Sequence, residues 1–154
     1  MPFVDLRATL PRRGDYERRK LSDIQWIAIH HSAVDIDSTS LSIAEYHISL
    51  GWPSCGYHMC VHWGGIVDWC NDLETVSYHV SGRNRECIGI CIPGGWSRVQ
   101  PPEQAVIAAR NTVRWIRAQL GREVPVVGHR EIALPGRGTS CPGDTWPLWK
   151  PRIA

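Results

Sequence analysis

Two histidines and one cysteine, residue types that bind transition metals, lie at or near the ends of predicted strands. His30 closes an apolar run, and His129 comes directly after residues 126–128. Cys141 follows twelve residues after His129, in a Pro- and Gly-rich stretch that can fold back over the strand end. Sites in α/β sheets assemble at the carboxyl edge of the strands. Two imidazoles and one thiolate suit Zn²⁺ and leave a fourth position for water, as in catalytic zinc sites. The alternative is that these are three unrelated polar residues.

A rival group, His58, Cys60 and His62, alternates along one predicted strand. His58 and His62 would be about 13 Å apart at strand rise, so all three cannot bind one ion. His31 points away from His30 if the strand continues, so we expect only one of these two to be a ligand. The other cysteines, which we interpret mainly as small buried residues, are Cys55, Cys60, Cys70, Cys87 and Cys91.

The strands that must position these residues follow from hydrophobic patterning. Residues 24–30 are typical of a buried strand, rich in β-branched residues and tryptophan. Residues 87–92 and 124–127 predict two further strands. Residues 57–63 and 66–70 flank a Gly-Gly pair, which predicts an antiparallel hairpin with a two-residue turn.

Two segments have helical patterns. In residues 42–50, Ser42 and Glu45 have the spacing of a capping box. Residues 102–120 carry apolar side chains at alternating spacings of three and four, and Gly121 is the predicted C-cap. Strands interspersed with helices predict an α/β fold with a mixed central sheet flanked by helices.

The composition fits one domain spanning residues 1–154, with 43% hydrophobic and 21% charged residues. A formal net charge of +2 does not indicate a nucleic-acid partner. The apolar runs are far shorter than the roughly 20 residues that span a bilayer, so we expect no membrane insertion. We interpret residues 1–23 as an N-terminal arm packed on or flanking the domain. A basic cluster, read mainly as a solvated part of this arm and otherwise as a weak attractor of anionic polymers, comprises Arg12, Arg13, Arg18, Arg19 and Lys20.

Four separated strings resemble the zinc-dependent N-acetylmuramoyl-L-alanine amidases, the family of phage lysozyme-type endolysins and peptidoglycan recognition proteins. They occur in the family's order and with similar spacing, and together cover nearly the whole domain. The opening VDLRATLPR also resembles phage-encoded members. The four strings are IAIHHSA (27–33), YHISLGWPSCGYHM (46–59), HVSGRNRECIGICIPGG (79–95) and VVGHREIALPGRGTSCPGD (126–144).

The resemblance implies roles for particular residues. The family's zinc ligands fall on His30, His129 and Cys141, which implies one Zn²⁺ per chain. Its catalytic tyrosine falls on Tyr57. Thr139 occupies the position two before the ligand cysteine, where some phage members have lysine and catalytic recognition proteins have threonine.

Three further positions match residues that line the family's groove and touch the muramyl peptide: His47, His79 and Asn84. Structural hydrogen bonding is the alternative role for them. The implied reaction is hydrolysis of the amide between the lactyl group of N-acetylmuramic acid and L-alanine. Zinc would lower the pKa of its bound water toward about 7, and Tyr57 and Thr139 would help to hold the oxyanion. The motifs assign no general acid or base.

We therefore expect a phage or prophage endolysin whose partner is bacterial peptidoglycan. With no secretory signal in the first residues, we expect it to be cytoplasmic in the producing cell and to act on the cell wall after release. We expect a monomer. One alternative is a cytosolic amidase that recycles muropeptides. The other is a non-catalytic peptidoglycan-binding protein, although receptors of that type usually lack the ligand cysteine.

Overall fold

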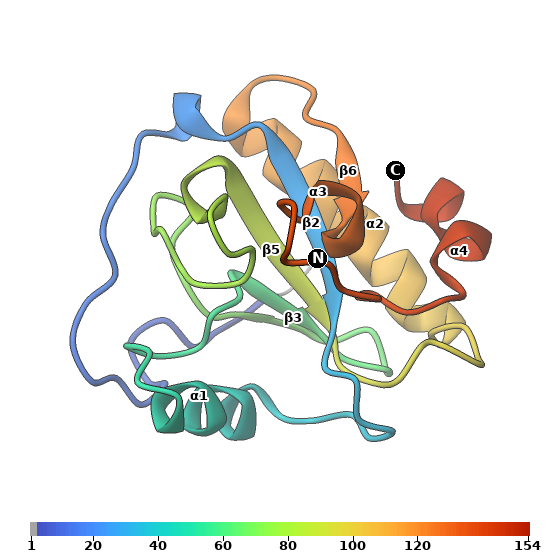
Figure 1. The fold of residues 1–154 in the computed structure, drawn as a ribbon, viewed down its shortest axis with the longest axis horizontal. Helices are drawn as coiled ribbons and strands as arrows, with labels where there is room; N and C mark the ends of the chain where they lie inside the picture. Colours follow the sequence, from blue (N-terminus) through green and yellow to red (C-terminus); the bar gives the residue numbers. More distant parts are fainter. Residues whose placement is uncertain (1–2) are drawn as a thin grey trace.

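The computed structural model describes residues 3–154, which fold around one sheet of six strands (Figure 1). The order across the sheet is β1-β4-β3-β5-β2-β6. β3 and β4 are antiparallel, and the other neighbouring pairs are parallel. The predicted mixed sheet is therefore confirmed. The strands are β1 (Phe3–Asp5), β2 (Trp26–His31), β3 (Met59–Val61), β4 (Val67–Trp69), β5 (Cys87–Ile92) and β6 (Val126–Gly128).

The long predicted helix is confirmed as α2, which ends where Gly121 adopts a left-handed conformation with φ 64°. The earlier helix, α1, begins before the predicted start. Its N-cap is Thr39, whose hydroxyl oxygen accepts from the Ser42 N–H at 3.1 Å. The predicted capping box at Ser42 and Glu45 is wrong, because Ser42 already lies inside the first turn. The helices are α1 (Ser40–Ser49), α2 (Glu103–Leu120), α3 (His129–Ile132) and α4 (Trp146–Ile153), with short 3₁₀ turns at Leu21–Asp23 and Asn84–Glu86.

The two faces of the sheet carry different side chains because neighbouring residues in a strand alternate between faces. Figure 1 shows α2 running along the far side of the sheet. On that side, β2 and β5 contribute isoleucines to a core shared with α2 and α4. The opposite side of the same strands carries small or polar residues, which leave room for a site: Ala28, His30, Cys87, Gly89 and Cys91.

The N-terminal segment is part of the fold and not a solvated arm. β1 extends the sheet as the parallel neighbour of β4. Arg19 is only 6% exposed, and its guanidinium donates to the carbonyls of Leu73 and Cys87. The interpretation of the basic cluster as solvated is therefore wrong for Arg19, because backbone carbonyls surround this charge. Residues 1 and 2 lie outside the described part of the chain.

The hairpin of β3 and β4 is antiparallel as predicted, but its turn is longer. His62 N–H donates to the Ile66 carbonyl at 2.8 Å, so Trp63 belongs to the turn together with the two glycines. Trp63 is held outside the ladder because its indole N–H donates to the Pro93 carbonyl and its backbone N–H to Asp37. Within residues 3–154, no helix has the length and apolar character needed to cross a bilayer.

Candidate active site

His30, His129 and Cys141 converge at the carboxyl edge of the sheet. β2 and β6 are parallel neighbours whose last pair is Ile29 with Gly128, and the residue after each of these is a histidine: His30 within β2 and His129 at the start of α3. The two rings have centroids 4.8 Å apart. Cys141 approaches from the loop between α3 and α4, and its Sγ lies 3.7 Å from His30 Nδ1. One ligand atom from each residue lies within 4.8 Å of the others, which is the arrangement a single metal ion requires.

The chemistry of these donors fits a zinc-class cation. His30 is 1% exposed, and burial holds its pKa well below the usual value, so the ring is neutral and keeps a free lone pair. Burial raises the pKa of the Cys141 thiol to about 12. The backbone N–H of His31 points at its Sγ from 3.4 Å and favours the thiolate. A dication between the donors would offset the remaining cost of a buried thiolate, and two imidazoles with one thiolate leave a fourth position open.

His79 fixes the orientation of the first ligand. His30 Nε2 lies 3.0 Å from His79 Nδ1, while the other nitrogen of His79 faces the Cys87 carbonyl at 3.4 Å. If His79 donates to that carbonyl, its Nδ1 accepts the His30 proton and leaves His30 Nδ1 free toward Cys141. Gly89 makes room for this ring, since a Cβ there would stand 2.7 Å from His79 Nδ1. His79 is thus in contact with His30, and it also lines a cavity.

Glu131 holds the turn that presents His129. Its Oε2 accepts from the Gly128 N–H at 2.5 Å and from the Trp146 indole at 2.9 Å. Its Oε1 accepts from Lys150 at 2.7 Å. Sequence reasoning missed this residue, although Gly128 and Glu131 have the spacing of a capping box, which was the available signal.

Tyr57 lies beside the ligand set. Its ring centroid is 5.2 Å from that of His30 and 5.4 Å from that of His47. Burial raises the pKa of the phenol well above its usual value, so the hydroxyl remains a proton donor at neutral pH. Asn71, another residue that sequence reasoning missed, donates its amide to the carbonyls of Tyr57 at 2.7 Å and Cys55 at 2.8 Å. These bonds fix the backbone that carries the phenol.

Thr139 lies at the ligand loop itself. Its hydroxyl oxygen accepts the Cys141 N–H at 3.1 Å, which positions the backbone of the ligand cysteine. The hydroxyl hydrogen remains available to another acceptor. The Thr139 side chain is half-buried, and its contact with the Cys141 N–H ties it to the loop that carries the cysteine.

His47 and Asn84 make structural hydrogen bonds. His47 Nδ1 accepts the Gly56 N–H at 2.9 Å, and its ring packs 4.5 Å from Trp52 between centroids. Asn84 Oδ1 accepts two backbone N–H groups, from residues 79–80, at 2.9 and 2.8 Å. Asn84 also lines a cavity, whereas His47 is buried.

Two cavities have linings that include His129 or residues next to His30 and Cys141. One has a volume of about 410 Å³ and includes His129, His79 and Asn84 in its lining, together with Trp52 and Tyr78. The other has a volume of about 640 Å³. Its lining includes the residues next to two ligands, His31 and Ser140, as well as Asp35, Trp63, Trp96 and Arg98.

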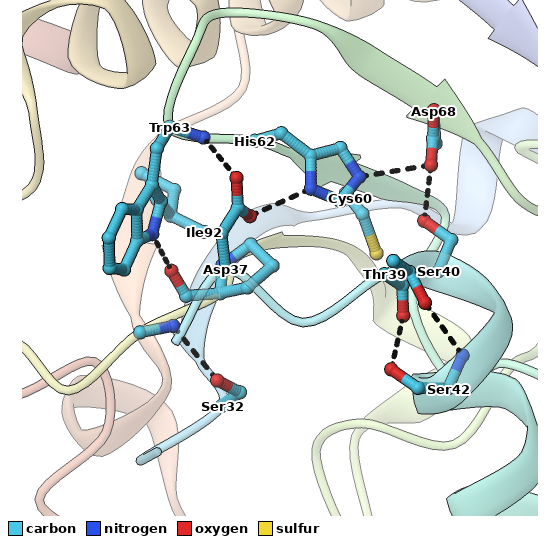
Figure 2. A network of polar contacts seen from close by, with 12 residues as sticks. Ser32, Asp37, Thr39, Ser40, Ser42, Cys60, His62, Trp63, Asp68 and Ile92 are labelled. Atoms are coloured by element: carbon cyan, nitrogen blue, oxygen red, sulfur yellow. Dashed lines mark hydrogen bonds and ion pairs between the residues drawn. The ribbon is translucent and has the colours of Figure 1, made fainter. Parts of the chain in front are cut away.

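The rival group has separate partners, as its spacing predicted. His58 Nε2 faces the Thr75 carbonyl at 2.9 Å. Figure 2 shows His62 between two carboxylates, with Nδ1 2.8 Å from Asp37 and Nε2 3.0 Å from Asp68. The sulfur of Cys60 lies instead 4.0 Å from the sulfur of Cys70. His31 also stays outside the ligand set, with its Nδ1 buried and without a hydrogen-bond partner in the described chain.

Comparison with known proteins gives this geometry its context. Residues 20–144 match the family described as N-acetylmuramoyl-L-alanine amidase. The chain belongs to this family. The amidase is 27% identical to the endolysin of Enterobacteria phage K11 over 128 residues, which cover 79% of this chain and 82% of the endolysin. It is 24% identical to peptidoglycan-recognition protein LB of Drosophila melanogaster over 165 residues, covering 91% of this chain and 69% of the relative.

Solved structures share the fold of the amidase. N-acetylmuramoyl-L-alanine amidase LysC from Clostridium intestinale URNW superposes with a TM-score of 0.79 at 21% identity, covering 97% of this chain and 94% of LysC. Drosophila PGRP-LB superposes with a TM-score of 0.76 at 22% identity, covering 93% and 88%. The resemblance, the fold class and the activity of a peptidoglycan amidase are thereby confirmed.

Proposed function

We propose that this amidase is a zinc-dependent endolysin of a phage or prophage, whose substrate bond joins N-acetylmuramic acid to L-alanine. The observation that carries the proposal is the convergence of His30, His129 and Cys141 within 4.8 Å, with His129 also lining a cavity. The similarity to the phage K11 endolysin supports the biological role. We propose that residues 1–154 act as one catalytic domain, with one zinc ion at this site, and as a monomer on bacterial peptidoglycan after release from the producing cell.

The zinc ion would be held by His30 Nδ1, by His129 and by the thiolate of Cys141. When bound, zinc lowers the pKa of a coordinated water and polarises the scissile carbonyl. The chain supplies the rest of the site. His79 keeps the His30 ring in the tautomer that presents Nδ1, and Glu131 keeps the turn before His129 in place.

Tyr57 is the proposed donor to the oxyanion that develops on the substrate carbonyl. Its phenol is protonated and lies beside the ligand rings, so it can donate without prior proton transfer. We propose Thr139, whose hydroxyl hydrogen is not used by the Cys141 contact, as a second donor. His47, His79 and Asn84 are proposed to shape the groove that receives the muramyl peptide.

The test is the identity of the bond that the protein cuts. Purified protein comprising residues 1–154 is incubated with peptidoglycan sacculi, and new amino termini are labelled and identified. The proposal predicts new L-alanine amino termini and no new reducing sugar ends. The Cys141→Ser variant should release none. New reducing ends, or cleavage at another peptide bond, would refute the proposed reaction.

A further inference from the structure

A second group of metal-binding side chains lies outside the candidate active site. The sulfur atoms of Cys55, Cys60 and Cys70 lie within 4.8 Å of one another. All three residues are 0% exposed, and Cys60 Sγ is 4.0 Å from Cys70 Sγ. The proposed mechanism uses none of them.

The backbone holds these three cysteines in place before any ligand arrives. Cys60 lies in β3 and Cys70 directly follows β4, so the hydrogen bonds of the hairpin fix their relative positions. Cys55 comes from the loop before β3, where its carbonyl accepts the amide of Asn71. A site built this way would bind a metal ion with little loss of conformational freedom.

The spacing of the sulfurs suits a shared metal ion. Sulfurs bound to zinc at about 2.3 Å stand roughly 3.8–4.0 Å apart in tetrahedral or trigonal geometry. A disulfide would bring one pair to about 2.05 Å and leave the third cysteine out. The number of converging sulfurs is the distinguishing feature.

The charges in the cluster favour a divalent ion. A cysteine that binds a metal ion does so as the thiolate. Three thiolates leave one net negative charge around a dication and two around a monocation. Because buried net charge is costly, the dication is preferred. Binding would release the three thiol protons.

We propose that Cys55, Cys60 and Cys70 bind a second, structural zinc ion. Cys91, the register partner of Cys60 on β5, belongs to the same buried cluster but lies outside this group of three, so it would join the site only by moving closer. Tyr57 packs against this cluster and is two residues from Cys55. The second ion would therefore tie the segment that carries the phenol to the hairpin.

Zinc content of single variants tests the second site. Protein is produced under reducing conditions with added zinc, freed of loose metal and measured for zinc per chain. We expect two zinc ions in the wild type and one in each of Cys141→Ser and Cys60→Ala. Cys87→Ala, which removes a buried cysteine from a different cluster, should retain both. The inference does not rest on the proposed function, since Cys141→Ser and Cys60→Ala report on different sites.

X-ray absorption at the zinc edge gives a second readout that needs no cluster variant to fold. The Cys141→Ser protein should show zinc with three or four sulfur neighbours. The wild type should average about two sulfurs per zinc or slightly more, against one for the active site alone. A zinc-free Cys141→Ser protein, or a wild type with one zinc and one sulfur neighbour, would overturn the inference. So would a disulfide among Cys55, Cys60 and Cys70 in the reduced preparation. Loading by Cu(I) but not by zinc would overturn the choice of a dication.

Discussion

At the scale of single residues, the site depends on how His30 is shared. Its Nδ1 faces Cys141 and its Nε2 faces His79, so the neighbour on one side decides which nitrogen is free on the other. Partners of this kind keep a metal-binding imidazole in one tautomer and one orientation. The His79 ring is therefore expected to act on metal affinity as well as on substrate.

Replacing His79 tests this role. His79→Ala should lower zinc affinity by about 10- to 100-fold, the usual effect of losing such a partner. The measurement is a zinc competition titration, with the thermal stability of the metal-free protein as a check on folding. His79→Gln, which can still offer an acceptor, should recover part of the affinity. A folded His79→Ala protein with unchanged zinc affinity would show that this contact does not support the ligand.

The phenol of Tyr57 has a separate effect. Tyr57→Phe should retain zinc but lower kcat by about 10²–10³, the effect of removing one oxyanion donor. Tyr46→Phe is the matched control, because Tyr46 is 62% exposed on α1. Peptidoglycan cleavage rates and zinc content are measured on both variants. Full activity in Tyr57→Phe would remove Tyr57 from the mechanism.

At the scale of the elements, parallel pairing of β2 with β6 brings the two histidine ligands together. β5 leaves room for the His79 ring, which contacts His30, because Gly89 has no side chain at that point. This part of the arrangement was predictable, because the strands are apolar runs and each ligand follows one directly. The spacing of Gly128 and Glu131 was a signal for their contact, but the contact of Glu131 with Trp146 was not predictable, because it forms only when α4 packs beside the turn. β1 was missed because three residues show no clear alternation.

Gly89→Ala tests the space at β5. The new methyl group would overlap the His79 ring, and crowding of a packed interior costs about 1–3 kcal/mol. We expect both lower stability in denaturant unfolding and weaker zinc binding. Gly64→Ala is the control, because a Cβ there meets no atom within 4 Å. Unchanged zinc affinity in Gly89→Ala would show that the His79 ring tolerates displacement.

A charged latch joins the loop before α1 to the hairpin (Figure 2). His62 lies between Asp37 and Asp68, and Asp68 also accepts the Ser40 hydroxyl at 2.6 Å. The hydrogen bond to Asp68, more than that to Asp37, raises the pKa of His62 to about 9. An unfolded chain has a histidine pKa near 6.5. The contribution to stability is therefore complete below about pH 6.5 and lost as the pH rises through about 9.

The pH dependence of unfolding tests the latch. Wild type and His62→Gln are unfolded in denaturant at pH values from 6 to 10. We expect a difference of about 1–3 kcal/mol at pH 6 that shrinks toward pH 10. A difference that stays constant across this range would show that His62 is neutral in the folded protein.

At the scale of the whole molecule, the hydrophobic core and the candidate site lie on opposite faces of the sheet. One face is filled by isoleucines that pack against α2 and α4. The other face carries the two proposed metal-binding groups, which are His30, His129 and Cys141, and Cys55, Cys60 and Cys70. Alternation of side chains along each strand explains this division, which the sequence analysis did not predict. The burial of Arg19 was not predictable, because its partners are His58 and several backbone carbonyls, and carbonyls have no signature in the sequence. The two cavities near the metal-binding residues also depend on loops, and the hydrophobic pattern of the sequence does not determine the paths of those loops.

The central claim is that cleavage of the amide to L-alanine depends on zinc held by His30, His129 and Cys141. The most direct measurement follows release of L-alanine amino termini from sacculi by one preparation before chelation, after chelation and after zinc is returned. We predict loss on chelation, recovery with zinc, and no release by Cys141→Ser at any stage. Release that persists without zinc, or that Cys141→Ser retains, would contradict the account.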